Sequence, residues 1–247
     1  MAEMLFYQRV VALNDGAHAD LRVSPVTDFR YAAKTNSVPL LGAEFADAAR
    51  EYPIVFVRTG NSVVPAALLG LRENENLFVG ADGKWDGRYI PAYVRRYPFV
   101  PAQDASGELV VCIDDAAACF GTGKGEPLFA AGKPSPQLDH AVNFLRDFQQ
   151  GVAATEAIVA RIETLGLLRD ADSLARLNDG REFRLNGLRV VDETKLRELD
   201  RDAVMELFTS GALRLIHAHL LSLGNLGRLV DRLNGSRISA SSSSSYH

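Results

Sequence analysis

A run of apolar residues at helical spacing is the feature that most constrains this chain. Steps near 3.6 residues separate its members, which are Leu138, Val142, Leu145, Phe148, Val152, Val159, Ile162 and Leu165. Ser135 and Pro136 stand before the run, where an N-cap residue and a first helical proline belong. The spacing predicts a helix over 136–165, roughly 45 Å long at 1.5 Å per residue. Gly151 is the position where such a helix is expected to bend.

Short β-like runs fill the half of the chain before this helix. They are rich in β-branched and aromatic residues, are separated by Gly, Asn, Asp and Pro, and cover residues 5–13, 53–59, 63–71, 76–80 and 108–114. The pair Gly60-Asn61 fits a tight hairpin between two of them, because both residues tolerate positive φ. A short helix is expected over 42–52. These runs predict a mostly antiparallel sheet.

The glycine- and proline-rich stretch 121–136 is loop-like and separates the two halves. Its GTGKGE sequence fits neither a phosphate-binding loop nor a dinucleotide fingerprint, so a linker is the favoured interpretation. In the second half, Asn186-Gly187 lies between two alternating segments and predicts a type I′ hairpin. Helices follow, with breaks near Ser210-Gly211 and Gly224.

These patterns together predict an α+β protein. We expect a β-rich part over 1–133, a helical part with an inserted hairpin over 134–238, and a disordered Ser-rich tail over 239–247. The two larger parts are expected to pack closely enough to act as one unit.

Composition narrows the classes of function. The 27 Lys and Arg residues against 31 Asp and Glu give a net charge of -4, which repels polyanions, so we expect no nucleic-acid partner. Apolar runs fall short of the roughly 20 residues that span a bilayer, and residues 1–16 do not read as a secretory signal. We therefore expect no membrane insertion and a cytoplasmic location. Cys112 and Cys119 lack metal-ligand spacing, so we expect reduced thiols, no metal and no cofactor.

Residues 83–99, GKWDGRYIPAYVRRYPF, are the most unusual segment. Aromatic rings and guanidinium groups alternate there, and the candidate ligand-binding residues are Trp85, Arg88, Tyr89, Tyr93, Arg95, Arg96 and Tyr97. Such groups bind carboxylates and similar anions through bidentate bonds and ring stacking. The structural alternative is a short helix of about two turns between Pro91 and Pro98, whose tyrosines pack on the sheet and whose arginines complement its last turn.

Four other residues could carry acid–base chemistry. Asp114 and Asp115 follow a predicted strand, where carboxylates serve catalysis, but an N-cap role before residues 116–120 is favoured. His217 and His219 form an HxH in a helical segment, where positions two apart diverge by roughly 200° and do not share one metal ion. Core or oligomer-interface roles are favoured for both histidines.

The chain resembles the SapC family of bacterial proteins. The resemblance is carried by YPIVFV at 52–57, by the pattern W-x₃-Y-I-P-A-Y-x-R-R-Y-P-F within 68–99, by GEPLFAAGKPSP at 125–136, and by the segments VVDETKL and GALRLIHAHLLSLGNL near the C-terminus. Family members have been labelled transport or surface-layer proteins, and no catalytic residues carry over from them. Their genes often lie near TonB-dependent receptors and halogenase-like flavoproteins, which implies a link to nutrient uptake or amino-acid chemistry.

We therefore expect a non-catalytic binding or assembly protein. Its 85–99 surface is predicted to contact a peptide, an anionic small molecule or a partner enzyme. One alternative is a small-molecule enzyme that uses Asp114, Asp115, His217 or His219 in a pocket between the halves. Another is a homo-oligomer in which the helix containing LRLIHAHLL buries a second face against another copy.

Overall fold

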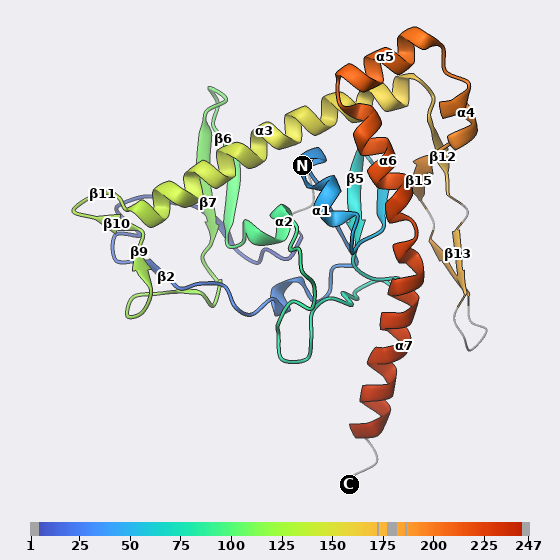
Figure 1. The fold of residues 1–247 in the computed structure, drawn as a ribbon. Coiled ribbons are helices and arrows are strands. Elements are labelled where there is room, and N and C mark those ends of the chain that lie inside the picture. The colour runs from blue at the N-terminus through green and yellow to red at the C-terminus, as the bar shows by residue number, and fades with distance from the viewer. Residues whose placement is uncertain (1–4, 172, 177–181, 186, 244–247) are drawn as a thin grey trace.

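The computed structural model describes residues 5–171, 173–176, 182–185 and 187–243. Its architecture is α+β, as predicted: antiparallel sheets dominate the first half and helices the second (Figure 1). The long helix α3 (Pro136–Thr164) lies across the molecule and contacts both β5 and β6, which belong to different sheets. This helix therefore joins the two sheets into one body.

Helix α3 begins and ends close to the predicted bounds. The Ser135 hydroxyl accepts a hydrogen bond from the N–H of Leu138 at 3.3 Å, so the N-cap is confirmed. The helix is continuous through Gly151. A Cβ there would lie 2.9 Å from Cδ1 of Leu41, so the absence of a side chain allows Leu41 to pack against the helix.

The larger sheet has five strands in the order β12-β15-β4-β5-β3. Their bounds are Leu168–Asp170, Leu188–Val191, Ile54–Thr59, Ser62–Leu68 and Ser37–Pro39. The hairpin between β4 and β5 is confirmed, with Thr59 opposite Ser62 and Gly60 at a φ of 59°. Because β15 pairs with β4, the two halves of the chain share this sheet.

A second sheet has three strands in the order β1-β7-β6, with bounds Val10–Ala12, Leu109–Asp114 and Phe99–Gln103. The predicted strand over 5–13 is therefore shorter than expected. No strand forms over 76–80, where only an isolated bridge joins Val79 to Trp85. The side chain of Asn76 explains this, because its Oδ1 accepts the N–H of Phe78 at 2.9 Å and turns the backbone.

The expected loop over 121–136 contains short strand pairs. Strands β8 and β9, Phe120–Gly121 and Glu126–Pro127, flank β2, Arg22–Val23. Strands β10 and β11, Phe129–Ala130 and Lys133–Pro134, pair with each other. The segment is therefore tied to the N-terminal part rather than standing as a free linker.

The predicted Asn186-Gly187 hairpin is wrong. Strand β14 (Glu182–Leu185) pairs with β13 (Ser173–Arg176), whereas β15 pairs with β12. Ser173 follows Asp170 by three positions, whereas their partners, Leu185 and Arg189, are four positions apart. The partner segment, between β14 and β15, therefore contains one extra residue at this point. Gly187 has a φ of 75°, which is typical of a glycine bulge; Asn186 lies outside the described residues.

The remaining helices are all shorter than α3. They are the 3₁₀ turns η1 (Arg30–Ala32) and η2 (Gly42–Glu44), and α1 (Phe45–Ala48), α2 (Ala92–Arg95), α4 (Glu193–Arg197), α5 (Arg201–Thr209), α6 (Ala212–Ser222) and α7 (Asn225–Ser243). Gly211, with a φ of 79°, separates α5 from α6 as expected. Helix α7 continues into the Ser-rich end as far as Ser243, and residues 244–247 lie outside the described residues.

Candidate functional site

The 85–99 segment runs between two hollows rather than along one groove. Trp85, Arg88 and Tyr89 line one of them, here called the Trp85 hollow. The other, called the Tyr97 hollow, is lined by Arg95, Arg96 and Tyr97. Tyr93 lines neither hollow and is only 6% exposed in the main core. The structure therefore divides the seven predicted residues into two groups and one core tyrosine.

Helix α2 positions the two arginines on different sides of this segment. It is one turn long rather than the predicted two, with Pro91 as its N-cap residue. Arg95 is exposed, and its Nε donates to the carbonyl of Ile90 at 2.8 Å. Arg96 is 9% exposed, and its Nε donates to the Tyr7 hydroxyl at 3.1 Å. Arg95 therefore remains available to a ligand, whereas Arg96 is committed to the interior.

The Tyr97 hollow has a volume of about 390 Å³ and mainly apolar walls. Its aromatic side chains are Phe29, Tyr31, Tyr97, Phe99 and Phe144, and its polar ones include Ser24, Gln137 and His140 besides the two arginines. No Asp or Glu lines it. Apolar walls with few convergent polar groups, at this volume, are typical of small-molecule sites.

Two stacked tyrosines form one wall of the Tyr97 hollow. The rings of Tyr31 and Tyr97 lie 3.9 Å apart at 14°, and the Tyr31 hydroxyl donates to the carbonyl of Val94 at 3.0 Å. Burial raises the pKa of both phenols above the ordinary value. Both rings therefore stay neutral near pH 7, and they do not repel an anion.

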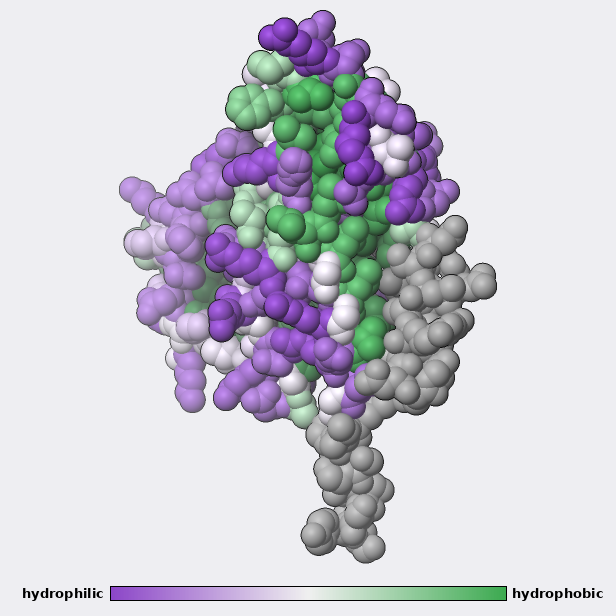
Figure 2. Space-filling view, turned by 45° about the vertical axis from the view of Figure 1, so that its right-hand side comes forward, coloured by the Kyte–Doolittle hydropathy of each residue, from purple (hydrophilic) through white to green (hydrophobic). Residues whose placement is uncertain are grey.

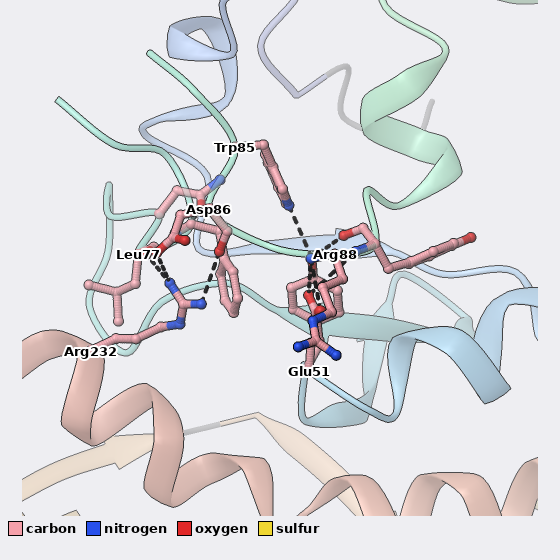
Figure 3. Close-up of polar contacts among 10 residues, drawn as sticks. Glu51, Leu77, Trp85, Asp86, Arg88 and Arg232 are labelled. Atoms are coloured by element: carbon pink, nitrogen blue, oxygen red, sulfur yellow. Dashed lines mark hydrogen bonds and ion pairs between the residues drawn. The ribbon is translucent and has the colours of Figure 1, made fainter. Parts of the chain in front are cut away.

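The Trp85 hollow is larger, at about 700 Å³, and more polar. Trp85 donates from Nε1 to the Tyr52 hydroxyl at 3.1 Å, and the Glu51 carboxylate accepts the backbone N–H of Arg88 at 2.8 Å (Figure 3). Gly87 makes this arrangement possible, because a Cβ there would lie 2.8 Å from Glu51 Oε2 and 2.9 Å from Trp85 Nε1.

Helix α7 contributes the opposite wall of the Trp85 hollow. Arg232 donates from NH1 to Asp86 Oδ2 at 2.6 Å and from NH2 to the Asp86 carbonyl at 2.9 Å (Figure 3). Its guanidinium also lies 4.2 Å from the ring centre of Phe78. Arg228, one turn earlier, donates to the carbonyl of Arg50 at 2.9 Å. Sequence reasoning missed both arginines, although their i, i+4 spacing on one helix indicated a shared face.

The acid–base candidates do not converge. Asp114 is fully buried and accepts the N–H groups of Gln8 and Arg9, each at 2.9 Å, and no helix follows it. Its role is to hold the N-terminal segment rather than to cap a helix. Asp115 forms an ion pair with Arg9. Neither carboxylate lines the Trp85 or the Tyr97 hollow.

His219 is a core residue that joins two strands. Its Nδ1 lies 2.8 Å from the carbonyl of Ile54 in β4, and its Nε2 accepts the N–H of Val191 in β15 at 3.1 Å. These bonds require a neutral ring protonated at Nδ1. Desolvation by burial lowers its pKa from 6.5 to about 4. His217 is exposed on α6, so the two histidines point to different environments, as the helical spacing predicts.

The comparison with protein families decides the assignment. The SapC family model matches residues 13–229, which include the whole 85–99 segment. The match also includes every lining residue of the Tyr97 hollow, and every lining residue of the Trp85 hollow except Arg232. The chain belongs to the SapC family. No curated protein and no solved structure gives a significant match to this SapC chain.

Two further properties of the SapC chain bear on the site. Within the ranges that the structure describes, none of the helices is sufficiently long and apolar to span a bilayer. In the same ranges, no three His, Cys, Asp or Glu side chains are grouped so that they could bind a metal ion.

Proposed function

We propose that this SapC chain is a non-catalytic binding protein that holds a small organic acid with an apolar or aromatic body in the Tyr97 hollow. One observation carries the proposal: guanidinium groups and aromatic rings line this hollow, and no carboxylate does. The positive charge of Arg95 is therefore uncompensated by any acidic group of the lining. An anion that brings its own apolar surface fits both properties.

The position of Arg95 indicates how such a ligand would lie. Its guanidinium is 5.4 Å from the ring centre of Phe144 and 5.8 Å from that of Tyr89, so it stays beside aromatic surface at the mouth of the hollow. A carboxylate would bind Arg95 there, with the apolar body against Tyr97 and Phe144. Arg96, which is 9% exposed and donates from Nε to the Tyr7 hydroxyl, adds positive charge from the wall of the hollow.

A cytoplasmic location, expected from the sequence, belongs to this proposal. An accessory role in nutrient uptake or amino-acid chemistry, which the family resemblance implies, is compatible with a ligand of this class. A peptide whose terminal carboxylate reaches Arg95 is the related possibility, since it would present the same group to the same guanidinium.

The test compares an acid with its neutral amide. We expect 3-phenylpropionate to raise the Tm of the full chain and to give measurable heat in calorimetry, while 3-phenylpropionamide does neither. In Arg95→Gln the preference for the acid should disappear, and in the matched control Arg88→Gln, in the other hollow, it should remain. Equal responses to acid and amide, or an unchanged preference in Arg95→Gln, would reject this function.

Self-association is the second candidate function, and the α5–α6 face favours it. Among the described residues, the large hydrophobic side chains that are exposed all lie on these two helices: Val204, Met205, Phe208 and Leu221, at 36%, 51%, 68% and 80%. Figure 2 shows apolar surface gathered on this side of the molecule. Patches of this kind mark association sites.

We propose a second copy of the chain as the partner of this face. Exposed charges of both signs, Asp202 and Arg214, flank the apolar residues. A patch with its own apolar centre and both signs of charge is self-complementary, which a two-fold interface requires. Sedimentation of the purified protein should show a dimer, and Phe208→Glu should convert it to a monomer whose circular dichroism spectrum matches that of the wild type. A monomer at all concentrations would reject the idea.

A further inference from the structure

We propose that the Trp85 hollow is a second and separate anion site, which binds a dianionic oxyanion group such as a phosphate monoester. The inference does not depend on the function proposed for the Tyr97 hollow. It depends on how the charged groups that line the Trp85 hollow are already used within the protein. Four arginines and three acidic residues line it: Arg50, Arg88, Arg228 and Arg232, and Asp47, Glu51 and Asp86.

Each carboxylate of this lining already has an internal partner. Glu51 accepts the backbone N–H groups of Arg88 at 2.8 Å and of Tyr89 at 3.4 Å. Asp86 accepts from Arg232 at 2.6 Å. Asp47 lies 3.5 Å from the guanidinium of Arg50. The four guanidinium groups of the lining therefore outnumber its three carboxylates, each of which already lies beside a donor.

Donors, in contrast, are left over on both walls. The Arg88 guanidinium makes no hydrogen bond or ion pair within the described residues, because the bonds of this residue run from its backbone N–H to Glu51. Arg228 uses NH1 for the Arg50 carbonyl, and its NH2 and Nε make no bond within the same ranges. One guanidinium comes from the loop after Trp85 and the other from α7, so an anion between them would meet donors from two sides.

The charged lining of the hollow favours an oxygen-rich dianion over the aromatic acid proposed for the Tyr97 hollow. The Arg232 guanidinium covers the ring of Phe78 at 4.2 Å, which removes much of the apolar surface that an aromatic ligand would need. Two forked guanidiniums match the several oxygens of a phosphate, each of which can accept more than one bond.

The experiment uses a reporter that the chain already contains. Trp85 is its single tryptophan and lines the hollow, so its emission reports on ligand binding without a label. The full chain is titrated with inorganic phosphate, with succinate as a dicarboxylate, and with sodium chloride at matched ionic strength. We expect a saturable change with phosphate, a weaker one with succinate and none with chloride.

Matched variants assign the response to this hollow. Arg88→Gln and Arg228→Gln should each weaken phosphate binding about tenfold, the loss of one charge-assisted contact, while Arg95→Gln leaves it unchanged. The last control is needed because the Trp85 ring also contacts Phe29, 5.8 Å away between centres, which lines the Tyr97 hollow. The Arg88 side chain makes no internal bond, so its variant should fold with an unchanged Tm.

Three results would overturn the proposal. The first is the absence of a saturable change up to about 10 mM phosphate. The dissociation constant would then be weaker than the millimolar value expected of a functional site. The second is equal phosphate affinity in the wild type and in both glutamine variants. The third is loss of binding only in Arg95→Gln, which would place the anion in the Tyr97 hollow. A failure of the aromatic-acid test changes none of these expectations, because Arg95 lies outside the Trp85 hollow.

Discussion

The guanidinium of Arg96 lies 3.9 Å from the ring centre of Tyr93 while its Nε donates to the Tyr7 hydroxyl at 3.1 Å. The ring of Phe148, from α3, lies 5.0 Å away on the same guanidinium. A desolvated cation among aromatic rings is stabilised more strongly than one at the surface. Arg96 therefore links the N-terminal segment, α2 and α3, whereas its neighbour Arg95 faces solvent.

This difference predicts that two adjacent alanine substitutions change the stability by very different amounts. Arg96→Ala should lower the free energy of unfolding by about 2–4 kcal/mol, because it removes a buried cation–π contact, a hydrogen bond and packing. Arg95→Ala should change it by less than about 0.5 kcal/mol, as exposed substitutions do. Urea denaturation of both variants measures the difference. Similar losses in the two would contradict the assignment of Arg96 to the interior.

His219 predicts a loss of stability in mild acid. The unfolded chain binds a proton at this residue near pH 6.5, but the folded chain does so only near pH 4, because burial disfavours the charged ring. Lowering the pH through this window therefore favours the unfolded state. The free energy of unfolding should fall by roughly 2 kcal/mol between pH 7 and pH 5 from this residue alone. Denaturant titrations at the two pH values measure this change in the free energy of unfolding.

A variant isolates the contribution of His219. His219→Gln should cost about 1–3 kcal/mol at pH 7, because its amide replaces the bonds to Ile54 and Val191 imperfectly. Its stability should then depend less on pH between 7 and 5 than that of the wild type. His217→Gln, on the exposed side of α6, serves as the control and should retain the full dependence. An unchanged slope in His219→Gln would mean that other groups cause the acid sensitivity.

Sequence periodicity predicted the parts of the fold that depend on local signals. The apolar spacing over 136–165, with its Ser135 cap, gave α3 almost to the residue, and Gly60 gave the β4–β5 hairpin. The error at Asn186-Gly187 has a physical reason: a glycine with positive φ serves a bulge as well as a turn. Only the pairing of β14 with β13 distinguishes these two cases, and pairing is not a local property.

The candidate site was predictable in its residue types but not in its geometry. The 85–99 segment does supply exposed guanidinium and aromatic groups. Their separation into two hollows depends on α3, which contributes Phe144 and His140, and on α7, which contributes Arg228 and Arg232. These contacts join residues more than 40 positions apart. No local pattern in a single sequence specifies which distant helices meet one loop.

Asp114 predicts a local opening of the N-terminal segment. Asp114→Ala leaves the N–H groups of Gln8 and Arg9 without an acceptor and should cost about 2–3 kcal/mol. Residues 5–9 should then exchange their amide hydrogens faster than in the wild type, while those of β4 and β5 are unaffected. Hydrogen exchange with mass spectrometry detects this. Asp115→Ala is the control, because the ion pair of Asp115 with Arg9 is exposed. If residues 5–9 are protected equally in Asp114→Ala and in the wild type, Asp114 does not hold the N-terminal segment.

Gly87 predicts that the floor of the Trp85 hollow tolerates no side chain. A methyl group there would lie 2.8 Å from Glu51 Oε2, 2.9 Å from Trp85 Nε1 and 3.0 Å from the Tyr52 hydroxyl. Gly87→Ala should therefore displace the carboxylate or the indole, shift the emission of Trp85, and cost about 1–3 kcal/mol of stability. Gly123→Ala is the matched control, because nothing lies within 4 Å of its added Cβ. If both variants keep the wild-type emission spectrum and Tm, the contacts around Gly87 do not shape the hollow.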